Sequence, residues 1–191
     1  RSLAFRKKRI GFIMLVIYTD ASYNTENGNA GWASIIFKQT DDPKDVTLKY
    51  VFGGRFKCCD SNVAEFMAIY FTIRRLEMCS IQETDINIMT DSLNSIEFLA
   101  VCISPNPRNL RKWYLVKKNK IEKECDEISH SPILNKIKFK HIMGHSNIEG
   151  NIFADAISKL YMKLHHQNVI KQKIEKIKRF SPLPLITISS I

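Results

Sequence analysis

The sequence lacks an acidic residue before Asp20, an apolar run of membrane-spanning length, and the cysteine spacings of finger or redox motifs. The apolar stretch at residues 10–18 is far short of the roughly 20 residues of a membrane span. It ends in Thr19-Asp20 without a small-residue cleavage site, which argues against an export signal despite the basic residues before it. What remains is a chain of 191 residues, enough for one domain with a core.

Cysteine is scarce and odd in number, with five residues and no Cys-x-x-Cys pair. Disulfide-rich secreted scaffolds and zinc fingers are therefore excluded. We expect reduced thiols, as in a cytoplasmic protein. We interpret the adjacent Cys58 and Cys59 as buried or half-buried packing residues more readily than as a redox pair.

The net charge of +10 is concentrated at the two ends of the chain. Residues 1–19 hold five Lys or Arg and no acid, and residues 161–191 hold six with a single acid, whereas residues 20–160 are balanced. Basic ends suit either a polyanionic partner or solubilising tails. We predict a basic extension at 1–10, a globular domain at 11–166, and a basic helix or tail at 167–191.

Hydrophobic patterning predicts an α/β fold. Residues 10–18 form a buried strand with Asp20 at its carboxyl end. Two further strands, the second closed by Gly53-Gly54, follow through short links that favour antiparallel pairing. The remaining elements alternate, and together they predict a five-stranded mixed sheet flanked by helices. The predicted strands are 10–18, 31–38, 46–53, 86–90 and 137–142, and the predicted helices are 62–78, 92–103, 110–128 and 151–166.

Four acids fall at the ends of strands or in the first turns of helices: Asp20, Glu65, Asp91 and Asp155. In α/β proteins, sites lie at the carboxyl ends of the strands. Carboxylates from separate elements can converge there when divalent cations offset their repulsion, and Mg²⁺ is the default ion for oxygen ligands. Two such ions about 3.5–4 Å apart can hold the attacking and leaving oxygens of a phosphodiester.

Each acid also has a plainer interpretation. Asn62-x-x-Glu65 has the form of a capping box, and Asp91 could cap the helix that begins at Ser92. Asp155 could be a solvated helix position, and Asp20 a turn residue. Taken together and in this order, the four acids favour a metal site.

Four motifs carry a resemblance to a known family: Tyr18-Thr19-Asp20-Ala21-Ser22, Asn62-x-x-Glu65, Thr90-Asp91-Ser92, and Gly144-His145 ahead of Asn151-x-x-x-Asp155. Over residues 11–165 the chain resembles type 1 ribonuclease H, a family that includes domains attached to retroelement reverse transcriptases. The resemblance implies the RNase H-like fold and hydrolysis of the RNA strand of RNA–DNA hybrids with two Mg²⁺ or Mn²⁺ ions. It implies the hybrid as partner and is compatible with an attached or associated reverse transcriptase. We expect a monomer, and the short apolar run predicts no membrane partner.

By position, the resemblance makes Asp20, Glu65, Asp91 and Asp155 the metal ligands, and it makes His145 a catalytic residue for proton transfer or product release. Asn151 shares a helix face with Asp155 and would orient the loop that carries His145. Contacts to the substrate are predicted for Ser22, Ser61, Asn62, Ser92 and Asn151. Asp60 departs from the family, since cellular enzymes usually carry a Thr there that helps to hold a DNA phosphate.

Residues 104–120 combine six Lys or Arg with Trp113 and Tyr114 and contain no acid. Positive charge with interleaved aromatic rings suits binding to a nucleic-acid backbone, and the stretch occupies the place of the family's basic handle. We predict that it grips the DNA strand, although a solvated helix face has the same pattern. The predicted substrate contacts here are Arg111, Lys112, Trp113, Lys117 and Lys118.

Two rival functions stay open. One is a catalytically silent nucleic-acid-binding domain, and the other is a different nuclease of the same superfamily, such as a relative of transposases or resolvases. A pure binder has little reason to place acids beside a polyanion, and an acid on the first helix favours ribonuclease H over the other nucleases.

Overall fold

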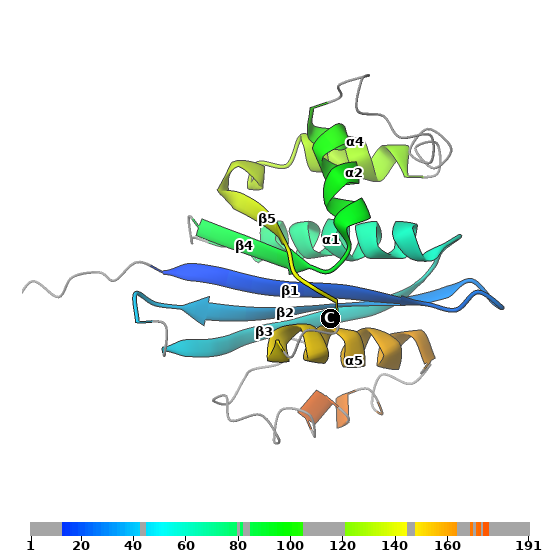
Figure 1. The fold of residues 1–191 in the computed structure, drawn as a ribbon, viewed down its shortest axis with the longest axis horizontal. Coiled ribbons are helices and arrows are strands. Elements are labelled where there is room, and N and C mark those ends of the chain that lie inside the picture. The colour runs from blue at the N-terminus through cyan, green and yellow to red at the C-terminus, as the bar shows by residue number, and fades with distance from the viewer. Residues whose placement is uncertain are drawn as a thin grey trace, which may run out of the picture.

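The computed structural model describes residues 13–42, 45–79, 81, 85–104, 121–144, 148–163, 169, 171–172 and 174–175. Its strands and helices alternate after a run of three strands (Figure 1). In chain order they are β1 (Met14–Tyr23), β2 (Asn29–Gln39), β3 (Val46–Lys57), α1 (Ser61–Met78), β4 (Asp85–Thr90), α2 (Leu93–Ile103), α4 (Glu122–Ser129), a 3₁₀ turn (Leu134–Lys136), β5 (Ile137–His141) and α5 (Glu149–Lys163).

The five strands form one mixed sheet in the order β3-β2-β1-β4-β5. β2 is antiparallel to β1 and β3, while β4 is parallel to β1 and β5. The predicted fold class and the antiparallel pairing of the first three strands are thereby confirmed. β4 pairs with β1 as far as Tyr18, opposite Met89, whereas β2 continues to pair with β1 as far as Tyr23. The end of β1 therefore has a strand on one side only.

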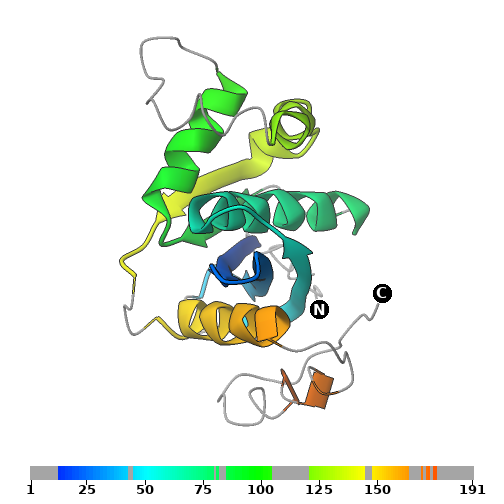
Figure 2. The ribbon, with the colours of Figure 1, turned by 90° about the vertical axis from the view of Figure 1, so that its right-hand side faces the viewer.

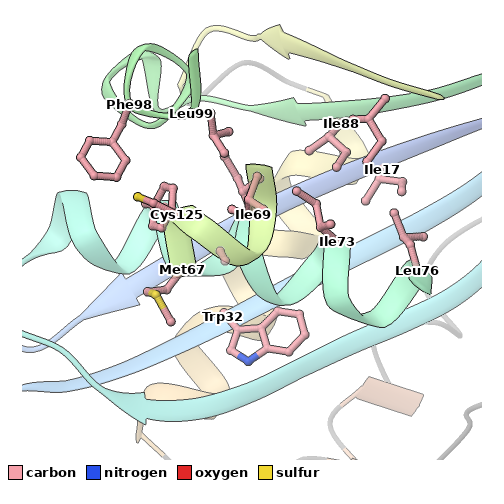
Figure 3. Close-up of a cluster of buried hydrophobic side chains, with 14 of the residues drawn as sticks. Ile17, Trp32, Met67, Ile69, Ile73, Leu76, Ile88, Phe98, Leu99 and Cys125 are labelled. Atoms are coloured by element: carbon pink, nitrogen blue, oxygen red, sulfur yellow. The ribbon is translucent and has the colours of Figure 1, made fainter. Parts of the chain in front are cut away.

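Helices cover both faces of the sheet (Figures 1 and 2). α1 lies on one face with α2 and α4 beyond it, and α5 lies on the other. β2 is buried on both faces, so its side chains alternate between two apolar clusters: Trp32 and Ile36 pack on the α1 side, Ile35 and Phe37 on the α5 side. Figure 3 shows part of the larger cluster, in which Ile17 lies beside residues of α1.

Glycine allows α5 to approach the sheet closely at two points. A side chain at Gly31 of β2 would overlap the carbonyl oxygen of Ser158, and a side chain at Gly150 would overlap the ring of Tyr18. Because backbone and ring leave no room for a Cβ, these contacts fix the height of α5 over β1 and β2. They also fix the position of every functional side chain that α5 carries.

Two predicted strand ends were wrong. Asp20 does not end its strand, because β1 continues for three residues paired with β2. Gly53-Gly54 does not close the third strand, which runs on to Lys57. The space that side chains would need at these two glycines is filled by the ring of Tyr161 and the indole of Trp32. The glycines therefore make room for neighbouring aromatic rings within the strand.

Several predicted segments lie wholly or largely outside the described residues: the extension at 1–10, the basic stretch at 104–120 and the tail at 167–191. Within the tail, Ile174 is buried in the α5-side cluster. The helix expected over 110–128 is described from residue 121 onward, where it contains α4. Among the described residues, none of the helices has the length and apolar character needed to cross a membrane.

Candidate metal centre

The parallel register of β1 and β4 brings two acids to the same edge of the sheet. The last pair is Tyr18 with Met89, and Asp20 and Asp91 each follow two residues later. The end of β5 holds this region in place, because the Ile142 N–H donates to the Thr90 carbonyl at 2.9 Å. His141 Nε2 also lies 3.2 Å from the Asp91 carbonyl oxygen, which accepts a hydrogen bond from the ring N–H.

Glu65 reaches the same edge from α1. The helix is capped by Asp60, whose Oδ1 accepts from the Val63 N–H at 3.0 Å, so Asn62 and Glu65 do not form a capping box. Glu65 lies more than one turn into the helix, and its Oε2 accepts from the Ala21 N–H of β1 at 3.2 Å. This bond fixes the carboxylate beside Asp20.

Asp91 does not cap a helix. Ser92 caps α2, with its Oγ accepting from the Ser95 N–H at 3.3 Å. The plainer interpretation of Asp91 as a helix cap is therefore wrong. One carboxylate oxygen from each of Asp20, Glu65 and Asp91 lies within 4.8 Å of the other two. Three carboxylates at this spacing are a suitable donor set for a hard divalent cation.

The electrostatics of the site favour a bound cation. The pKa of Asp20 is raised from 3.8 to about 7, mainly by burial. A hydrogen bond from Ser158 and the charge of Lys159 act to lower this pKa, and the charges of Asp91 and Asp155 act to raise it. Burial, followed by the charges of Asp20 and Asp91, also raises the pKa of Glu65 well above its usual value. Deprotonating both groups is costly unless positive charge enters the cluster, so the residues present fit a divalent metal.

Ser158 of α5 is a site residue that the sequence did not reveal. Its fully buried hydroxyl donates to Asp20 Oδ2 at 2.7 Å, and Ser22 Oγ lies 2.8 Å from it and can donate in turn. The available signal was its spacing, since Ser158 follows Asp155 by three residues and so shares its helix face. Ser22 is 9% exposed and has this partner inside the protein, and its contact with substrate stays a prediction.

Asp155 differs from the other three acids. Its Oδ2 forms an ion pair with Lys159 Nζ at 2.6 Å, and its side chain is 43% exposed. It is not part of the group of three carboxylates, although its charge raises the pKa of both Asp20 and Glu65. Asp155 therefore lies beside the cluster with a cation of its own, and its role as a metal ligand stays a prediction.

Gly144 lies next to the cluster, but His145, the residue that follows it, lies outside the described residues. A Cβ at Gly144, the preceding residue, would come within 3.3 Å of Asp91 Oδ2. Asn151 is 4% exposed, and its Oδ1 has no hydrogen-bond partner among the described residues. Its proposed contact with the loop stays a prediction.

The remaining predicted substrate contacts divide into two groups. Ser61 and Asn62 lie in the first turn of α1, and Asn62 Oδ1 accepts from Asn94 Nδ2 of α2 at 3.1 Å. Asn94 had no signal in the sequence, because only the packing of α1 beside α2 brings the two amides together. The second group lies outside the described residues: Arg111, Lys112, Trp113, Lys117 and Lys118.

The sequence and the structure of this chain are both similar to RNase H proteins. Residues 14–163 match the RNase H family model. No curated protein sequence matches the chain. Among solved structures, the N-terminal RNase H domain of a Mycobacterium tuberculosis protein is 16% identical with a TM-score of 0.54, covering 84% of this chain and 98% of that one.

Two further structures share the fold. LC11-RNase H1, solved with an RNA/DNA hybrid, is 20% identical with a TM-score of 0.51, over 78% of this chain and 96% of that one. The protease-reverse transcriptase of prototype foamy virus is 22% identical with a TM-score of 0.56, over 87% of this chain but only 23% of its own.

Proposed function

This chain belongs to the RNase H family, and on that basis we propose that it is a metal-dependent endonuclease that hydrolyses the RNA strand of RNA–DNA hybrids. The observation that carries the proposal is the cluster of Asp20, Glu65 and Asp91, whose carboxylate oxygens lie within 4.8 Å of one another. Two of these acids are raised in pKa by burial, so they resist ionisation until a cation arrives.

Each side chain has a separate task in this proposal. Asp20, Glu65, Asp91 and Asp155 hold the metal, and two bound Mg²⁺ or Mn²⁺ ions supply the positive charge that activates water and stabilises the departing 3′ oxygen. Ser158 directs one oxygen of Asp20, and the Ala21 N–H directs one oxygen of Glu65.

His145 is assigned the transfer of a proton or the release of product, because an imidazole titrates near neutral pH. Its position in sequence supports this role, since it follows Gly144, where a Cβ would meet Asp91.

Selection of the hybrid requires contacts to both strands. RNA is distinguished by its 2′-hydroxyl groups and the wide minor groove of the hybrid. Ser61 and Asn62 stand at the start of α1, three or four residues before Glu65, and are the proposed contacts to that groove. The basic stretch at 104–120 is assigned to the DNA backbone, where charge makes binding sensitive to salt.

The test is a cleavage assay on matched substrates of one sequence: an RNA–DNA hybrid, a DNA duplex, an RNA duplex and the single strands. Each is incubated with Mg²⁺, Mn²⁺ or a chelator. We expect cleavage of the RNA strand of the hybrid with either metal and none with chelator. The Asp20→Asn variant should lose cleavage and keep binding, since it retains the shape of the side chain and removes its charge.

The outcomes separate the rival functions. Binding of the hybrid without cleavage at any metal concentration would support the silent binding domain. Cleavage of duplex DNA in preference to the hybrid would support another nuclease of the superfamily. Either result overturns the proposal.

The assignment of residues 104–120 has its own test. Reversing the charge of Lys117 and Lys118 should weaken hybrid binding and flatten its dependence on salt concentration, because fewer counterions are released. An unchanged salt slope would remove this part of the proposal. Because the foamy virus neighbour is a protease-reverse transcriptase, a polymerase partner is a further proposal, which co-purification of the native protein would test.

A further inference from the structure

We propose that Cys102 and Cys125 are a dithiol site that forms a reversible disulfide and thereby joins α2 to α4. Their Sγ atoms lie 2.6 Å apart, although 23 residues separate them in the chain. A disulfide bond is about 2.05 Å long, so closing the bond needs a movement of about half an ångström. This site is independent of the acidic cluster and of the proposed activity.

The surroundings of the two thiols hold them in this arrangement. Cys102 lies near the end of α2 and Cys125 in the middle of α4. Cys125 is 6% exposed and belongs to the α1-side cluster, and the half-buried Cys102 packs against the same cluster (Figure 3 shows Cys125 near Phe98 and Leu99). Because both helices pack on one apolar core, the sulfurs meet without a change in the fold.

The other three cysteines offer no comparable pair. Cys58 and Cys59 are adjacent in sequence, and adjacent Cα atoms are about 3.8 Å apart, below the usual range for a disulfide. Their Sγ atoms are directed to Asp60, with Cys58 donating to its carbonyl oxygen at 3.2 Å and Cys59 to its carboxylate at 3.5 Å. Cys79 is exposed at the end of α1.

The oxidant that completes the reaction is a low-molecular-weight disulfide such as glutathione disulfide. The thiolate of Cys102, the more exposed of the two, attacks one sulfur and releases one glutathione thiolate, which takes up a proton. Cys125, after losing its own proton, then attacks the sulfur of Cys102, breaks the mixed disulfide and releases the second glutathione. The protein loses two electrons and two protons, and the oxidant becomes two glutathione thiols.

Closing this bond would tie both ends of a single segment together. Residues 103–124 include the whole stretch in which Arg108, Arg111, Lys112, Lys117, Lys118 and Lys120 are found. A disulfide restricts the unfolded chain by closing such a loop, and it therefore stabilises the folded state. The ends of this basic segment would be cross-linked in the oxidised protein and not cross-linked in the reduced protein.

The test incubates the full chain with glutathione disulfide, blocks the remaining thiols with an alkylating reagent, and identifies linked peptides by mass spectrometry after acidic digestion. We expect a peptide that links Cys102 to Cys125. In denaturant, the thiol count should fall from five to three and return to five with reductant. The oxidised protein should melt roughly 5–10 °C higher than the reduced protein.

Variants make the assignment specific. Cys102→Ala and Cys125→Ala should each lose the linked peptide and the difference in melting temperature, while Cys79→Ala, a matched control at an exposed cysteine, should keep both. If Cys102→Ala or Cys125→Ala does not fold, the peptide map of the wild-type chain still tests the proposed bond. Five reactive thiols after oxidation, or a bond between any other two cysteines, would overturn the proposal.

Discussion

The pair of Asp20 and Glu65 lies next to the pair of Asp155 and Lys159, and the two pairs differ in how their charges are compensated. Asp20 is buried and Glu65 is half-buried, and both have raised pKa values. Asp20 accepts a hydrogen bond from Ser158, and Glu65 accepts one from the Ala21 N–H. Asp155 is 43% exposed and is paired with Lys159 at 2.6 Å. The first pair depends on a cation from outside the protein, whereas the second carries its own.

This difference explains why a carboxylate cluster is tolerated at all. Four acids that all lacked counterions would destabilise the fold by mutual repulsion. Here the fourth acid is paired with Lys159, one turn away, and the two acids with raised pKa values can hold protons until a metal replaces them. The same arrangement predicts that substituting Asp155 changes metal affinity and stability less than substituting Asp20 or Glu65.

The largest expected effect comes from removing one buried charge. Glu65→Gln should lower hybrid cleavage at least about 100-fold, because the developing charge loses part of its electrostatic support. The same change should raise the melting temperature of the metal-free protein at pH 8, since it replaces a carboxyl whose pKa is raised in the fold with a neutral amide. Asp155→Asn, compared in the same melting experiment, should give no such gain, and an equal gain would erase the contrast between the two pairs.

The stability of the metal-free protein should fall as pH rises, whereas stabilisation by Mg²⁺ should increase as pH rises. The pKa of Asp20 is about 7 in the fold against 3.8 for an unperturbed carboxyl, so the native state keeps a proton that the unfolded chain loses. The metal-free protein therefore loses this contribution as pH rises from about 4 through 7. Mg²⁺ must displace that proton, so its effect on the melting temperature should be larger at pH 8 than at pH 5.5.

The Asp20→Asn variant is the control for this pH series. It has no proton to release at this position, so its melting temperature should respond less to pH and to Mg²⁺ than that of the wild type. A Mg²⁺ effect that is equal at both pH values in the wild type would mean that the buried carboxyls are already ionised.

A smaller effect is expected at the hydroxyl that supports Asp20. Ser158→Ala removes the donor at 2.7 Å from Asp20 Oδ2 and should weaken Mg²⁺ binding about 3- to 10-fold, as expected for one hydrogen bond of ordinary net strength. Calorimetric titration with Mg²⁺ measures this directly. Ser22→Ala removes the hydroxyl that is hydrogen-bonded to Ser158, and it should weaken binding less. The reverse order would assign Ser22 the direct role.

The smallest expected effect is at Lys159. Lys159→Gln removes a cation that competes with metal for Asp155, so Mg²⁺ binding should tighten, by less than about threefold because the pair is half-exposed and screened by solvent. The gain should shrink at high salt. Weaker binding in this variant would show that Lys159 helps to position Asp155 instead of competing for it.

The sequence predicted the order of elements well because strands buried on one or two faces and amphipathic helices have distinct periods. It also predicted Asp20, Glu65 and Asp91 as neighbours, because strand ends and the first helix meet at one edge. It did not predict that β1 passes Asp20, since pairing with β2 decides that boundary, nor that Gly53-Gly54 lies within a strand, since rings from Trp32 and Tyr161 fill the space there.

Ser158 and Lys159 show how far sequence spacing predicts contacts at the site. Lys159 follows Asp155 by four residues on α5, so spacing alone indicates their ion pair. Nothing in the spacing of Ser158 indicates that its hydroxyl donates to Asp20. That contact depends on how closely α5 approaches the sheet, which is set by Gly31 and Gly150. Local patterns carry no information about such a distance.

The most direct test of the central claim is the anomalous diffraction of a crystal soaked in Mn²⁺ near pH 8. We expect an anomalous peak within metal–oxygen bonding distance of carboxylate oxygens from Asp20, Glu65 and Asp91. Absence of a peak at these three acids in a crystal that holds Mn²⁺ elsewhere would contradict it.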